Sequence, residues 1–223
     1  MTIRTRLTPF FLLAVPLLLA AGLARAVDET PFDAELRGLA QAWDHANFDN
    51  ADSDARRTAL EPLTERAAKF VEHYPDRAES HIWEGIVLSS YAGAKGGLGA
   101  LGYAKRSRAA LEAALKLDPA ALNGSAYTSL GVLYYKVPGF PLGFGDHDKA
   151  RDYLRQALKL NPDGIDPNYF FGELMYEEGN YRDALRYLSK AESADPRPNR
   201  PVADSGRRKE AALLIAKAES RLR

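Results

Sequence analysis

The chain has 223 residues, with 30 basic and 30 acidic side chains and a formal net charge of zero. This balance gives no indication of nucleic acid or an anionic membrane surface as a partner. The chain contains no cysteine, which excludes disulfides, thiolate metal sites and a catalytic thiol.

The first 26 residues have the features of a signal peptide. Arg4 and Arg6 form a basic segment, residues 10–21 are apolar, and Ala24-Arg25-Ala26 is an A-x-A cleavage site. The apolar run is short for a membrane span, and no cysteine near the site offers a lipid anchor. We therefore expect cleavage after Ala26, a periplasmic location and no stable membrane anchor after cleavage.

Two helices are predicted next, over residues 33–48 and 54–73. The second carries Leu60, Leu63 and Ala67 at helical spacing and ends before Pro75. Pro62 indicates either a kink in this helix or its true first turn.

Three tetratricopeptide (TPR) repeats are predicted from there, over residues 78–119, 124–162 and 165–196. Pro162 and Pro196 each follow a second helix and stand 34 positions apart, which is the TPR period. Each repeat places a glycine in its first helix and a small residue in its second, so that the two helices can pack closely. The glycines are Gly85, Gly131 and Gly172, and the small residues are Ser107, Ala150 and Ala184.

The C-terminal segment consists of a proline-rich linker, residues 196–201, and an amphipathic helix over residues 205–222. A charged terminal helix is typical of the cap that a solenoid needs. The sequence therefore predicts one all-α domain over residues 27–223, a TPR-like solenoid or bundle of α-hairpins with about nine helices.

Two insertions interrupt the repeats. Ala150 follows Tyr134 by 16 positions, whereas Ala184 follows Met175 by 9, so residues 136–146 form a longer turn rich in proline, glycine and apolar residues. A second insertion, predicted to be a glycine-rich loop, covers residues 91–103 of the preceding repeat. Insertions at equivalent points emerge on one edge of a solenoid, so we expect them to be neighbours. They either form a binding site or lid, or pack on each other and seal the core.

The first helix of each pair should form the inner face of the array, which is aromatic and mildly polar. We expect it to present Ile82, Ile86, Thr128, Val132, Tyr135, Tyr169, Glu173 and Tyr176. The candidate ligand- or partner-binding residues combine aromatic groups for burial with polar groups that orient a ligand. They are Tyr135, Lys136, Phe140, Phe144, Asn168, Tyr169 and Glu173. The alternative is a closed face filled by its own side chains.

Catalytic, metal-binding and cofactor-binding residues are not indicated. Gly97, Gly99 and Gly102 match a dinucleotide fingerprint in spacing, but no strand precedes them. The four histidines form no close pair. The segment Asp146-His147-Asp148 is interpreted as a helix N-cap. We therefore expect a protein that is not an enzyme.

Residues 130–146 and 160–170, with the segments LGVLYYKVPGFPLGFGD and LNPDGIDPNYF, resemble the T-component family of tripartite ATP-independent periplasmic (TRAP) transporters. The resemblance implies an all-helical TPR-like bundle with a central pore or cavity. It also implies a periplasmic solute-binding component as partner and a small hydrophobic ligand. We expect a periplasmic TPR protein that binds a partner protein, a small apolar organic ligand, or both. The alternative is a general interaction scaffold of the cell envelope without a ligand cavity.

Overall fold

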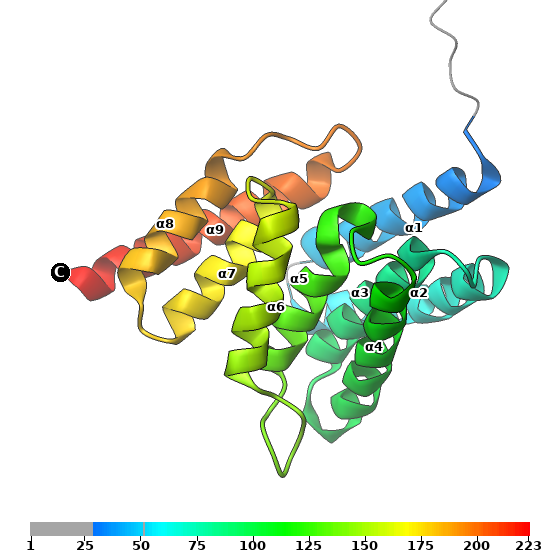
Figure 1. The fold of residues 1–223 in the computed structure, drawn as a ribbon, viewed down its shortest axis with the longest axis horizontal. Coiled ribbons are helices and arrows are strands. Elements are labelled where there is room, and N and C mark those ends of the chain that lie inside the picture. Colours follow the sequence, from blue (N-terminus) through cyan, green and yellow to red (C-terminus); the bar gives the residue numbers. More distant parts are fainter. Residues whose placement is uncertain (1–28, 51) are drawn as a thin grey trace, which may run out of the picture.

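A computed structural model describes residues 29–50 and 52–223, and the predicted signal peptide therefore lies outside the described residues. The described part contains nine α-helices and no strand beyond an isolated bridge between Gly139 and Gly145. This confirms the predicted all-α fold (Figure 1). The helices are α1 (Pro31–Phe48), α2 (Ser53–His73), α3 (Ala78–Lys95), α4 (Gly97–Leu117), α5 (Ala121–Lys136), α6 (His147–Leu160), α7 (Ile165–Glu177), α8 (Tyr181–Ser193) and α9 (Pro201–Leu222).

Helices α3–α8 form three antiparallel pairs whose close contact depends on the repeat glycines. A Cβ atom added to Gly131 would lie 2.5 Å from Leu154 Cγ, so any larger residue would push the two helices of the pair apart. The same geometry recurs at Gly85 with Leu111 and at Gly172 with Leu188. Ser107 is buried, and its hydroxyl donates a hydrogen bond of 2.6 Å to the Gly85 carbonyl. The predicted small residues therefore lie at the pair interfaces.

Helix ends follow the predicted signals with small shifts. Asp146 accepts a hydrogen bond of 3.1 Å from the Lys149 backbone N–H, so it caps α6. Pro62 lies inside α2, which begins at Ser53; the alternative of a first turn at Pro62 was wrong. Pro201 begins α9 four residues before the predicted start, because proline fits the first helical position, where no N–H partner is needed.

The insertion at residues 91–103 is not a loop, and the prediction of two neighbouring loops was wrong on this side. Helix α3 continues to Lys95 and α4 begins at Gly97, so the extra residues lengthen both helices. Gly96 makes the tight turn between them with a φ of 62°. The rings of Tyr91 and Tyr103 pack edge to face at 4.7 Å, which holds the lengthened helix ends together. The other insertion is a non-helical loop between α5 and α6, as predicted.

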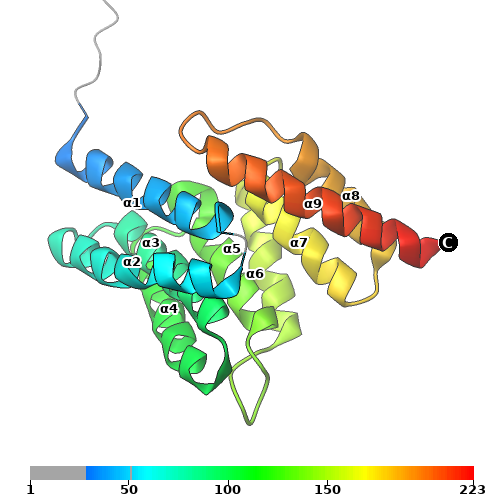
Figure 2. The ribbon, with the colours of Figure 1, turned by 180° about the vertical axis from the view of Figure 1, so that it is seen from behind.

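The buried core has two parts that share partly buried residues. One part lies among α1, α2 and α3, and the other extends from α3 to α9; both contact Ile86, Tyr103 and Leu122. Helix α9 packs along α8 and α7 and also reaches α1 (Figure 2). There, Gly206 approaches the Phe48 ring so closely that an added Cβ atom would clash with it. The predicted capping helix therefore also contacts the first helix of the array.

None of the described helices combines the length and the apolar character needed to cross a membrane.

Candidate binding cavity

A cavity of about 1990 Å³ extends along the inner face of the helical array. Helices α1, α3, α5 and α7 form most of its wall, and the linker between α8 and α9, residues 194–200, borders one end. Predicted inner-face residues at its wall are Ile86, Thr128, Val132, Tyr169 and Glu173. The inner face is therefore not completely filled by its own side chains.

Both insertions border this cavity. The turn and first residues of α4 contribute Gly96, Gly97, Ala100 and Leu101. The loop after α5 contributes Val137, Pro138 and Leu142. In Figures 1 and 2 the α3–α4 turn and this loop lie near the same end of the molecule. The two insertions are therefore neighbours, as expected, although one of them is helical.

Glu173 is the centre of a polar cluster on the cavity wall. Its carboxylate accepts a hydrogen bond of 2.5 Å from the Tyr135 hydroxyl and lies 3.1 Å from Lys136 Nζ. Lys136 Nζ also donates to Glu177 at 2.5 Å. Burial raises the pKa of Tyr135 well above its usual value, and the Glu173 carboxylate raises it further. Burial opposes the charge on Lys136, but Glu173 and Glu177 outweigh it and raise the pKa of that ammonium.

Tyr169 and Phe170 receive the guanidinium of Arg207, which lies 4.6 Å and 4.4 Å from the two ring centroids. Such contacts are favourable because the ring face is electron-rich. Burial is the main cause that raises the pKa of Tyr169, followed by the nearby charge of Glu173. Arg207 is itself buried and donates a hydrogen bond of 3.1 Å to Asp166. The tyrosine therefore presents a neutral, immobilised ring to the cavity.

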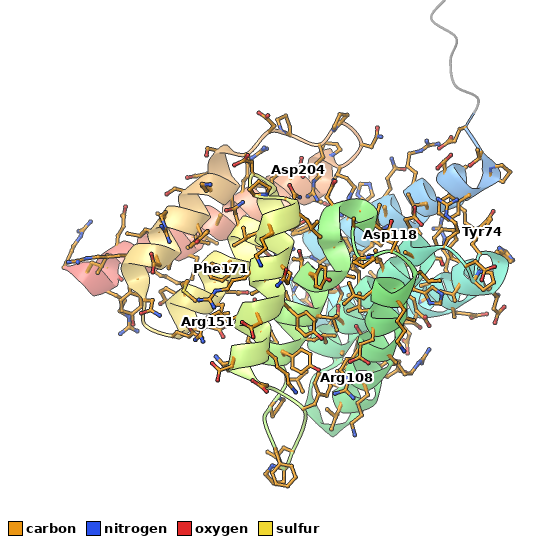
Figure 3. The ribbon with its side chains drawn as sticks, in the orientation of Figure 1. Tyr74, Arg108, Asp118, Arg151, Phe171 and Asp204 are labelled. Carbon is orange, nitrogen blue, oxygen red and sulfur yellow. The ribbon has the colours of Figure 1, made fainter. Side chains whose placement is uncertain are left out.

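Arginines of the linker and α9 hold the C-terminal end of the cavity together, and sequence analysis missed them. Arg197 bridges Asp166 and Asp204, with hydrogen bonds of 2.7 Å to each carboxylate. Asp204, labelled in Figure 3, lies where the linker meets α9. Burial acts to raise the pKa of Asp166, but the charges of Arg197, Arg207 and Arg200 outweigh it and hold that pKa well below its usual range. The sequence signal that could have indicated them is the pair of arginines, Arg197 and Arg200, in a short proline-rich linker.

The structure brings three of the seven predicted site residues to the cavity wall: Lys136, Tyr169 and Glu173. Tyr135 is buried and contacts Glu173 through its hydroxyl. Asn168 is fully buried, and its amide donates hydrogen bonds of 2.8 Å to the carbonyls of Pro162 and Gly164. Its side chain thus supports the turn before α7 rather than the cavity wall.

The two phenylalanines of the loop lie in different surroundings. Phe144 packs against the Tyr134 ring at 5.5 Å, and the Arg108 guanidinium lies 4.3 Å from its centroid. Arg108 is labelled on α4 in Figure 3, near the base of the loop. Phe140 is 94% exposed at the far end of the loop. Neither ring lines the cavity; Phe144 joins the loop to α4, and Phe140 faces solvent.

Among the described residues, no three histidine or acidic side chains are grouped as a metal ion would require. Glu178 accepts a hydrogen bond of 2.6 Å from Arg151 and lies 3.6 Å from His147 Nδ1. This ion pair lies between α6 and the end of α7 and is not part of the cavity wall.

Comparison with known proteins supports the TPR assignment. The family model described as Tetratricopeptide repeat matches residues 142–204, which run from the loop after α5 into α9. No curated protein sequence matches the chain.

Solved structures with related folds include TTC0263, a thermophilic TPR protein of Thermus thermophilus. It is 18% identical with a TM-score of 0.56, covering 85% of this chain and 99% of that chain. MamA is 20% identical with a TM-score of 0.43, covering 76% of this chain and 93% of its own. PilF of Pseudomonas aeruginosa is 15% identical with a TM-score of 0.34, and the match covers 86% of this chain and 94% of PilF. The Thermus structure and the family match show a TPR-like helical-repeat fold.

Proposed function

We propose that this chain is a non-enzymatic periplasmic TPR-like protein whose cavity binds an extended segment of a partner protein. TPR arrays typically mediate interactions between proteins through the surface that their stacked repeats create. The observation that carries the proposal is the continuous cavity along α3, α5 and α7. Its volume of about 1990 Å³ exceeds the roughly 300–1,000 Å³ typical of sites for small molecules. A chain segment would fill it better.

Selection from an unbiased library of displayed peptides tests this function. The purified protein should enrich peptides that also bind in solution, measured by fluorescence anisotropy. Val132→Trp places a large ring on the cavity wall and should weaken binding at least tenfold. Leu213→Trp is the matched control, because Leu213 is 66% exposed on α9 and lies away from the cavity wall. The proposal fails if no peptide is enriched, or if the two variants bind peptide equally.

A small apolar organic ligand is the second candidate, and a particular part of the cavity favours it. The side chains that α4 and α5 contribute to the wall include Ala100, Leu101, Val132 and Leu133, and α3 adds Ile86. Such a surface favours burial of an apolar molecule. Native mass spectrometry of freshly purified protein should show a bound mass that Val132→Trp removes. An identical unliganded mass for both proteins would exclude this candidate.

A role as a TRAP transporter T component is the finer form of this proposal. It rests on the resemblance of residues 130–146 and 160–170, which supply the α5–α6 loop and the start of α7. Crosslinking in intact cells from a photoreactive residue at position 142 should then capture a periplasmic solute-binding component. A different dominant partner would leave the general scaffold function and remove the transporter role. The N-terminal sequence of the mature protein checks export, with cleavage expected after Ala26.

A further inference from the structure

The cationic side chains that line the cavity are paired with acidic groups, with one exception. Lys136 lies 3.1 Å from Glu173, and Lys190 lies 3.7 Å from Asp163. The other paired cations of the wall are Arg37 with Glu29, Arg197 with Asp166, Arg200 with Asp44, and Arg207 with Asp166. Arg56 also lines the cavity, but no acidic side chain of residues 29–50 or 52–223 lies within ion-pair distance of it.

Arg56 is half-buried, and one atom of its guanidinium is closed to solvent. Its Nε atom is buried and has no hydrogen-bond partner among the described residues. A buried donor without an acceptor is unfavourable for folding, so native structures rarely retain one without another use. The terminal nitrogens of Arg56 are not buried in this way, so they are the donors that a ligand in the cavity can reach.

Asn47 precedes the short connection between α1 and α2, and Arg56 follows it. Asn47 lies next to the last residue of α1, whereas Arg56 is in the first turns of α2, and both line the cavity. The Asn47 amide makes no hydrogen bond with another described residue, so its donors are available to a ligand. Figure 2 shows that this end of α1 lies toward the middle of the molecule, and α1 contacts α9 there.

We propose that Arg56, assisted by Asn47, binds a carboxylate carried by the partner segment in the cavity. This inference rests on the proposed function and specifies the chemistry of its ligand. The planar guanidinium matches a carboxylate through two parallel N–H···O bonds from its terminal nitrogens. Because the other cations of the wall are already neutralised, Arg56 contributes the positive charge that an incoming anion meets. The carboxylate belongs to an aspartate or glutamate side chain or to the C-terminus of the segment.

The peptides enriched in the display selection provide the probes. For each peptide, we compare the parent with versions in which Asp becomes Asn, Glu becomes Gln, or the C-terminus is amidated. One of these changes should weaken binding to the wild-type protein at least tenfold by anisotropy. The side-chain changes and the terminal amide distinguish the two sources of the carboxylate.

Arg56→Gln should bind the parent peptide at least tenfold more weakly and respond little to the same neutralisation. Arg57→Gln is the matched control, because the neighbouring Arg57 is half-exposed, pairs with Asp54 at 3.4 Å and does not line the cavity. It should bind like wild type. Equal binding of charged and neutral peptides, or equal behaviour of the two variants, would overturn the inference. If binding still depends on Val132 in that case, the proposed function survives; if nothing binds, both fail.

If Arg56 instead served the fold, its removal should lower the melting temperature. Arg56→Met removes the unpartnered donor and keeps the apolar stem, so the melting temperature should stay the same or rise. A clear fall in the melting temperature would show that Arg56 serves the fold instead, which would overturn the inference independently of any peptide.

Discussion

Asp44 of α1 accepts hydrogen bonds of 2.7 Å and 3.0 Å from Arg200, a residue 156 positions later in the chain. Asp44 is 2% exposed, and the Arg200 guanidinium also lies 5.1 Å from the Trp83 ring. This pair joins the first helix to the linker that borders the cavity. It therefore fixes the distance between the two ends of the array.

Loss of this pair should be costly. In Asp44→Ala the Arg200 guanidinium loses its acceptor in a largely buried site, and breaking such a pair typically costs about 3–5 kcal/mol. Urea unfolding followed by circular dichroism measures the change. Asp54→Ala is the control, because its pair with Arg57 is exposed and should contribute less than about 1 kcal/mol. Similar losses of unfolding free energy in both variants would contradict a stabilising role for the Asp44–Arg200 pair.

Acid should destabilise the protein partly through Asp166. Its folded pKa is lowered by Arg197, Arg207 and Arg200 despite burial, whereas an unfolded aspartate titrates near about 3.9. The stability that it contributes is therefore present above about pH 4 and is lost as the pH falls toward the folded pKa. The urea midpoint of the wild type should fall from pH 5 to pH 3, and that of Asp166→Asn should fall less. Parallel profiles would show that Asp166 does not control the acid limb.

Asp44 should act with the opposite sign. Burial raises its folded pKa, although Arg200 opposes this effect. A carboxyl group with a raised folded pKa favours the folded state most at low pH, and this contribution is lost as the pH rises through that pKa. Asp44→Asn should therefore lose relative to wild type at pH 3 and recover part of the difference by pH 7, measured from urea midpoints. A difference that grows with pH would contradict this assignment.

The repeat glycines provide a test of helix packing. Gly131→Ala places a Cβ atom 2.5 Å from Leu154 Cγ, and overpacking of this kind costs about 1–3 kcal/mol. Gly93→Ala is the matched control within α3, where no atom lies within 4 Å of the added Cβ. It should stabilise the protein by up to about 1 kcal/mol, because alanine favours the helix. Thermal unfolding of both variants distinguishes the two effects; the same sign for both would refute the packing argument.

The amide of Asn168 should matter for the fold more than for binding. Asn168→Ala leaves the Pro162 carbonyl without its side-chain donor, while the Gly164 carbonyl keeps only a bond of 3.4 Å from the backbone N–H of residue 168. The change should cost about 1–3 kcal/mol of stability. The affinity of the folded variant for an enriched peptide should change by less than twofold. A large loss of affinity at unchanged stability would show that Asn168 takes part in binding.

The repeats could be predicted from sequence because their signals are local. Glycine at the crossing point, small residues opposite it and proline after the second helix each act over a few residues, and the structure places Gly85, Gly131 and Gly172 at those crossings. Residues 91–103 were mistaken for a loop because glycines usually interrupt helices. The packing of Tyr91 against Tyr103, which depends on tertiary structure, overrides that preference.

The site was harder to predict than the fold. Inner-face spacing identified Tyr169 and Glu173, which line the cavity. The linker arginines were missed, because Asp44, which pairs with Arg200, and Asp166, which pairs with Arg197, are distant in sequence and leave no periodic signal. Arg56 was missed for a related reason. It differs from Arg57 in having no ion-pair or hydrogen-bond partner among the described residues, and only the folded structure reveals that difference.

The contact between Phe48 and Gly206 changes how this array should melt. In an open solenoid each repeat is stabilised by its neighbours alone, so the terminal units fray first and unfolding spreads inward. Here α1 packs against α9, the last helix of the array. Neither end can loosen without disturbing the other, so the molecule should lose its structure as a single cooperative unit.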